Sequence, residues 1–151
     1  MAASPYAPDT GKYEAARRGI NDQYGGGTAV NAYGRFLGQQ RGSRQLTDMS
    51  RGFERSYPGF GASFAPRGMT GNGINSGVMQ RSMQNYVGDF QRDYARSQQD
   101  LTQSLQGYDL QQAQLDAWKQ GQLADLELAR SQEIANAAMN LEALRNYYGG
   151  Q

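Results

Sequence analysis

The sequence of 151 residues contains no cysteine and no histidine, and its two lysines are Lys12 and Lys119. The absence of cysteine excludes disulfides and thiolate metal sites, and leaves the redox compartment open. The absence of histidine removes the commonest general base, and two lysines offer few amines for covalent catalysis. These absences predict a protein that is not an enzyme and that uses no cofactor or metal ion.

Proline, long apolar runs and net charge are also scarce. The four prolines all precede residue 67, and no run approaches the roughly 18 apolar residues of a membrane span. The N-terminus lacks a basic segment followed by an apolar core, so we expect neither a signal peptide nor a membrane span. We expect a protein that is made in the cytoplasm and stays soluble there or is built into a larger particle.

The charges nearly cancel over the whole chain, with 15 basic and 14 acidic residues. This balance gives no whole-chain argument for nucleic-acid binding. The two halves differ, because residues 1 to 81 carry ten basic and five acidic groups, net +5, whereas residues 82 to 151 carry five and nine, net −4. Opposite halves could therefore attract each other, within one chain or between copies.

The segment 76–148 has no proline, and its apolar side chains recur with a mean step of about 3.6 residues, the period of an α-helix. An unbroken helix of this length would be about 110 Å long, which a compact domain cannot cover. We therefore expect its apolar stripe to be covered by another chain or a large assembly. The stripe consists of Met83, Val87, Phe90, Tyr94, Leu101, Leu105, Tyr108, Leu115, Leu123, Leu126, Ile134, Leu141, Leu144 and Tyr148.

Two glycines inside this segment, Gly107 and Gly121, leave a second architecture open. Each costs a helix about 1 kcal/mol relative to alanine, so a helical hairpin could fold near either one. Neither position has the proline, Asn-Gly or serine-rich cluster typical of a tight reversal, so a continuous helix is favoured. Because tyrosine, phenylalanine and polar residues interrupt the leucines, the stripe favours a trimer or larger ring over a dimeric zipper.

The first half of the chain has a different composition, rich in glycine, tyrosine and arginine. Residues 1–57 are predicted to form an arm, extended as far as Thr10 and then containing short helices. Gly25 to Gly27 are predicted to end the first short helix, because consecutive glycines cost the most backbone entropy to order. Residues 58–75 are predicted to be a Gly/Pro-rich loop, followed by the long helix 76–148 and a tail 149–151. The fold class is mainly α, with the long helix in an oligomeric bundle.

A row of arginines in the first half is the best candidate for contact with phosphate or with an acidic partner. Aromatic residues lie between these arginines, and guanidinium groups pair with phosphates while aromatic faces stack on bases. The alternative is that the arginines pair with the acidic half of a neighbouring copy. Nucleic acid is therefore a possible partner but not the favoured one. The row comprises Arg35, Arg41, Arg44, Arg51, Arg55 and Arg67.

From Arg67 onward the sequence resembles small structural proteins of tailed bacteriophages. The resemblance rests on three features: a glycine-containing turn, a small-residue helix cap with Ser-Gly, and a long helix rich in Gln, Leu, Arg and Asp. The residues that carry it are Arg67-Gly68-Met69, Ile74-Asn75-Ser76-Gly77, Arg81, Gln91-Arg92-Asp93-Tyr94-Ala95-Arg96, Leu101, Leu105, Leu110 and Leu115.

The resemblance implies a non-enzymatic virion component, present in several copies near the portal, the tail axis or the tail tip. Its partners would be copies of itself and other virion proteins, and it would be assembled in the host cytoplasm. Two other functions remain open. One is an internal protein that contacts the phage genome or is ejected with it, and the other is a cellular coiled-coil adaptor.

Overall fold

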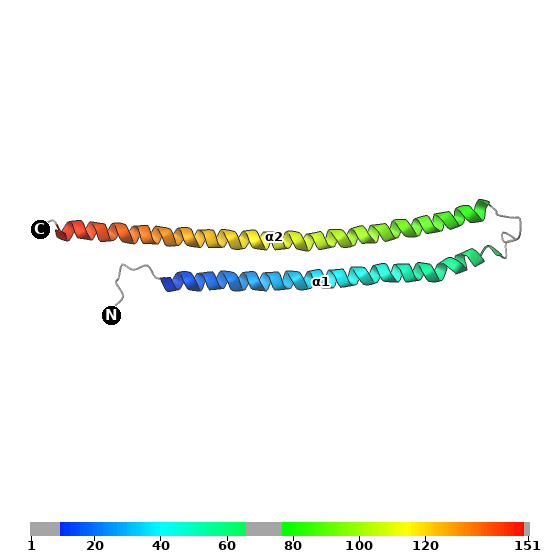
Figure 1. Ribbon diagram of the computed structural model, residues 1–151, viewed down its shortest axis with the longest axis horizontal. Coiled ribbons are helices and arrows are strands. Elements are labelled where there is room, and N and C mark those ends of the chain that lie inside the picture. The colour runs from blue at the N-terminus through cyan, green and yellow to red at the C-terminus, as the bar shows by residue number, and fades with distance from the viewer. Residues whose placement is uncertain (1–9, 66–76, 150–151) are drawn as a thin grey trace. The chain divides into compact units, whose positions relative to one another are not determined.

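The computed structural model describes residues 10–65 and 77–149. They form two helices, α1 from Thr10 to Ala62 and α2 from Gly77 to Gly149 (Figure 1). This described part contains no β-strand. The predicted mainly α class is confirmed.

The chain divides into two units, and each contains a segment of both helices. Unit 1 combines Met1–Asn31 with Leu110–Gln151, and unit 2 spans Ala32–Asp109. In unit 1 Tyr13 contacts Glu133 and Tyr24 contacts Asp116, so the position on α2 falls as the position on α1 rises. Phe53 with Phe90 and Phe60 with Tyr86 follow the same order in unit 2. The two helices therefore run antiparallel within each unit.

Helix α2 has nearly the predicted bounds and is continuous, so the hairpin near Gly107 or Gly121 does not form. A Cβ atom at either glycine would meet nothing within 4 Å. Each glycine therefore costs only helix propensity, which the contacts on the opposite face of α2 offset. The predicted capping residues Asn75 and Ser76 lie outside the described residues.

The prediction for the first half is wrong over residues 10–62. Three short helices separated by glycine were expected, and the structure has one helix of 53 residues that passes through Gly25, Gly26 and Gly27. Propensity alone would end this helix, since each glycine costs about 1 kcal/mol. The helix persists because several of its glycines lie in the contact with α2. The predicted extended arm before Thr10 lies outside the described residues.

The glycines at this contact leave room for large side chains of α2. A Cβ atom at Gly34 would lie 2.8 Å from Cε1 of Tyr108, and one at Gly27 would lie 3.0 Å from Cδ2 of Leu115. Both distances are too short for any other residue type to fit without a shift of the neighbour. We call the set the glycine seam, and its members are Gly27, Gly34, Gly38 and Gly42.

The predicted loop begins five residues later than expected, because α1 continues through Pro58 to Ala62. A proline inside a helix removes one hydrogen bond and costs about 3 kcal/mol. Aromatic stacking opposes this cost, since the Phe60 ring lies 4.4 Å from that of Tyr86 and the Phe53 ring lies 4.1 Å from that of Phe90. Residues 66–76 lie outside the described part of the chain.

The stripe on α2 is covered within its own chain over much of its length. Every stripe residue from Met83 to Leu126 is half-buried. We expected this cover to come from another molecule, because the first half was predicted to be an arm. Helix α1 supplies it instead, through the glycine seam and the aromatic residues at its C-terminal end.

We predict that Gly34→Ala and Gly52→Ala have opposite effects on stability. Both gain helix propensity, and a Cβ at Gly52 meets nothing within 4 Å, so Gly52→Ala should raise the free energy of unfolding by up to about 1 kcal/mol. At Gly34 the new methyl group overlaps the Tyr108 ring, and overpacking costs about 1–3 kcal/mol. Urea unfolding followed by circular dichroism measures the difference, and equal stabilisation by both substitutions would contradict the seam.

Candidate functional site

A polar network joins the two helices in unit 1. The Tyr24 hydroxyl donates a hydrogen bond of 2.6 Å to Asp116 Oδ1, and Gln112 Nε2 donates one of 3.0 Å to the same oxygen. Asn31 Nδ2 donates to Gln112 Oε1 over 3.3 Å. The Lys119 ammonium lies 4.2 Å from the centroid of the Tyr24 ring. Tyr24, Asn31, Gln112 and Asp116 match hydrogen-bond donors to acceptors, and Lys119 adds a cation–π contact, so together they favour one register of α1 on α2.

Gln112 and Lys119 are two of the polar residues that interrupt the stripe of α2, and the stripe alone did not predict their role. Both are half-buried and face Tyr24 on α1. Polar residues interrupt the stripe of α2 at the level where Tyr24 and Asn31 lie on the facing side of α1. The sequence signal was the match between these two sets of polar residues. It could not be used while the first half was assumed to be an arm.

Two ion pairs connect the basic first half with the acidic second half. Lys12 Nζ lies 2.5 Å from Glu133 Oε2 in unit 1, and Arg35 Nη1 lies 3.0 Å from Asp109 Oδ1 in unit 2. The charge asymmetry seen in the sequence is therefore used within one chain at these two places. Exposed ion pairs of this kind contribute little to the free energy of folding, about 0–1 kcal/mol each. Their main effect is on the relative orientation of the two helices.

Two tyrosine hydroxyls bind carboxylates across the helix contact, and both have a raised pKa. The hydrogen bond to Glu133 is the main cause for Tyr13, followed by burial and by repulsion between the phenolate and that carboxylate. Asp116 has the same effect on the pKa of Tyr24. In each case the neutral phenol donates the hydrogen bond, and the phenolate that replaces it would face a negative charge.

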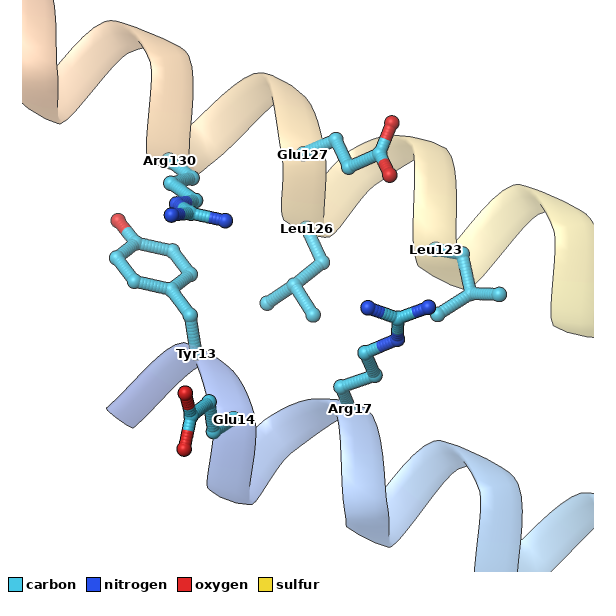
Figure 2. A pocket seen from close by; sticks show the side chains of 7 residues that line it. All are labelled: Tyr13, Glu14, Arg17, Leu123, Leu126, Glu127 and Arg130. Atoms are coloured by element: carbon cyan, nitrogen blue, oxygen red, sulfur yellow. The ribbon is translucent and has the colours of Figure 1, made fainter. Parts of the chain in front are cut away.

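A hollow of 170 Å³ lies on the surface of unit 1, beside the Tyr13–Glu133 contact. Figure 2 shows Leu126 pointing from α2 into the space between Tyr13 and Arg17 of α1. The Arg130 guanidinium lies near the Tyr13 ring, whereas Glu127 points away from α1. The lining combines Tyr13 and two leucines with two arginines and two glutamates.

A second hollow, of 330 Å³, lies in unit 2 and exists because glycines line it. Gly38 and Gly42 lack side chains there, and Leu101 and Tyr108 fill only part of the space. Arg41 and Asp100 lie at its edge. This hollow is a consequence of the glycine seam.

Apolar groups remain exposed on α2 where α1 does not cover it. The contacts nearest the start of α1 are those of Lys12 and Tyr13 with Glu133. Beyond that point the stripe continues, with exposures of 46% at Ile134, 50% at Leu141 and 74% at Tyr148, while Leu144 is half-buried. The remaining large apolar residues exposed on the unit 1 part of α2 are Leu110, Leu128, Met139 and Tyr147.

The structure places five of the six predicted arginines on α1, and all five are exposed. Arg35 pairs with Asp109. The other four follow one another at spacings of three, seven and four residues, which puts them along one side of the helix. We call Arg41, Arg44, Arg51 and Arg55 the arginine row. Arg67 lies outside the described residues.

We predict that the two tyrosine–carboxylate contacts make the structure sensitive to alkali. Because their folded pKa values lie above the ordinary value of 10.0, the stabilisation is complete below about pH 10 and is lost as pH rises through the folded pKa. Urea midpoints measured from about pH 8 to about pH 11 should fall less steeply for Tyr13→Phe/Tyr24→Phe than for the native chain. Tyr33→Phe, at an exposed ring, is the control, and an unchanged slope in the double variant would contradict the assignment.

Three observations bear on the classes of function open to the chain. Neither described helix has an apolar stretch long enough to cross a bilayer. In the described ranges, no three His, Cys, Asp or Glu side chains gather as a metal site would require. Comparisons with protein-family models, with curated proteins and with solved structures found no match.

Proposed function

We propose that the protein is a non-enzymatic structural component of a tailed-bacteriophage virion, built in several copies into the portal, the tail axis or the tail tip. The resemblance over the second half of the chain supports this proposal. So does the form of the chain, because two paired helices without a convergent set of reactive side chains suit assembly better than chemistry.

The observation that carries the proposal is the set of apolar side chains left exposed on α2. Ile134 is 46% exposed, Leu141 50% and Tyr148 74%, and their spacing of seven residues places all three on one face of α2 beyond the part that α1 covers. Single exposed leucines are common on protein surfaces, but several along one helix indicate an interaction surface. Burying them would yield about 25 cal/mol per Å² of apolar surface, before the costs of association.

The internal pairing of α1 with α2 helps such an assembly. A free helix loses backbone entropy when it binds, whereas a helix already held by its own chain has lost that entropy on folding. Each copy would therefore bring a preformed surface to the virion. Several copies repeated around an axis would then multiply a modest contact area per copy.

A labelling experiment tests this function. Particles are purified from a culture of the phage that encodes the chain and are incubated with a gold-conjugated antibody against it. We expect label at the portal vertex or along the tail, and we expect the chain in the mass spectrum of washed particles. Particles of a phage lacking the gene provide the control. Absence of the chain from intact particles would contradict the proposal.

The alternative, contact with the phage genome, is favoured by the arginine row. Its four guanidinium groups are exposed on one side of α1 and can reach a phosphate backbone without disturbing the contact with α2. Asp48 and Glu54 lie on the same stretch and reduce its net charge. A short basic row of this kind would bind with little sequence preference and with strong dependence on salt.

Salt titration with a short DNA duplex tests this alternative. If the row binds phosphates, Arg51→Gln/Arg55→Gln should weaken binding and lower the slope of log K against log salt by roughly two between about 50 and 200 mM salt. Arg81→Gln/Arg96→Gln removes the same charge from exposed positions on α2 and serves as the control. Equal effects of both pairs, or no binding at low salt, would exclude the arginine row as a genome contact.

A further inference from the structure

The apolar stripe of α2 extends beyond the part of the helix that α1 covers, and this difference in length points to a second interface. Helix α1 starts at Thr10, whose neighbours Lys12 and Tyr13 reach Glu133. Helix α2 then continues to Gly149, and its stripe keeps the same period through Ile134, Leu141 and Tyr148. Figure 1 shows this end of α2, in red, extending past the start of α1, in blue, within unit 1.

The composition of this end of α2 suits a copy of itself. Residues 134–148 carry one acidic and one basic residue, Glu142 and Arg145, so two copies meet without net repulsion. Two alanines, at positions 137 and 138, lie within about 60° of Leu141 around the helix. Small residues facing large ones already form the contact between α1 and α2, where Gly34 faces Tyr108. The same pairing of small with large is available here between two identical surfaces.

We infer that residues 134–148 of α2 form an antiparallel contact with the same residues of a second copy, centred on Leu141. An antiparallel pair centred there sets Leu144 opposite Ala138 of the second copy, while Leu141 meets Leu141 and Ile134 meets Tyr148 as apolar pairs. Such a two-fold contact is closed, because the same surface serves both copies. It rests on the proposed function, since it names the contact through which two copies would be joined.

The lack of cysteine makes a clean cross-linking test possible. In an antiparallel pair centred on residue 141, Leu141→Cys brings two thiols within disulfide distance under mild oxidation. Ile134→Cys places its two thiols about 21 Å apart along the axis, so it should not cross-link alone. A mixture of Ile134→Cys and Tyr148→Cys chains should cross-link with each other. Equal cross-linking of Leu141→Cys and Ile134→Cys would show a parallel pair and overturn the inference.

Sedimentation of the full chain supplies the second measurement. The native chain should rise from 16.6 kDa toward twice that mass with increasing concentration, and Leu141→Asp should weaken the association about tenfold or more by placing an unpaired charge in the contact. Leu128→Asp is the matched control, because residue 128 is an exposed leucine about 140° around the helix from residue 141. Circular dichroism should show the same helix content in both variants.

The outcomes separate this inference from the proposed function. A chain that stays monomeric at every concentration, or that dimerises only after deletion of residues 1–9, overturns the self-contact. Equal weakening by Leu128→Asp and Leu141→Asp also overturns it. If the antibody still labels virions in these cases, the structural role stands and the contact alone fails. If the chain forms a dimer with the expected cross-links but virions carry no label, the inferred contact is supported and the proposed function is contradicted.

Discussion

The close approach of the glycine seam to α2 is the constraint on which the structure depends. Side-chain atoms of Tyr108 and Leu101 lie where a Cβ atom at Gly34 or Gly42 would be, so any larger residue there would force these side chains to shift. The contact explains why a helix rich in glycine is stable. Each glycine costs about 1 kcal/mol of helix propensity, while burying a large apolar side chain yields about 1.5–3 kcal/mol when complete and less when partial. The helical conformation of α1 therefore depends on its contact with α2.

The two units satisfy this constraint with different chemistry. Unit 2 stacks aromatic rings of α1 on Tyr86 and Phe90, and includes Phe64, which is 6% exposed. Stacking of this kind adds about 0.5–1.5 kcal/mol per pair beyond buried area, but it tolerates sliding. Unit 1 uses directional hydrogen bonds around Asp116 and Gln112, which a shift by one turn would break. Affinity between the helices thus comes mainly from rings, and register mainly from polar groups.

Helix α2 could be predicted from sequence because its evidence is local. An apolar period of 3.6 without proline specifies a helix whatever covers it, and both its continuity and its limits were expected to within one residue. Helix α1 could not be predicted in this way, because Gly25 to Gly27 break helices in isolation and Pro58 does so more strongly. The spacing of the glycines carried information about α1, since Gly27, Gly34, Gly38 and Gly42 follow one another at intervals of seven, four and four residues. That pattern marks one helical face, and it has meaning only when a partner with large side chains is known.

The candidate surfaces change once α1 is recognised as the partner of α2. Between Met83 and Leu126 the stripe is half-buried against α1 within each unit, and separation of the helices would expose it together with the glycine seam and the aromatic rings. The pairing leaves the stripe beyond Glu133 exposed, and Leu128 and Met139 are exposed on another face of α2. The predicted preference for a trimer or larger ring came from the tyrosine, phenylalanine and polar residues that interrupt the leucines of the stripe. Two of these polar residues have partners on α1, Gln112 with Tyr24 and Asn31 and Lys119 with the Tyr24 ring, so they carry no information on copy number.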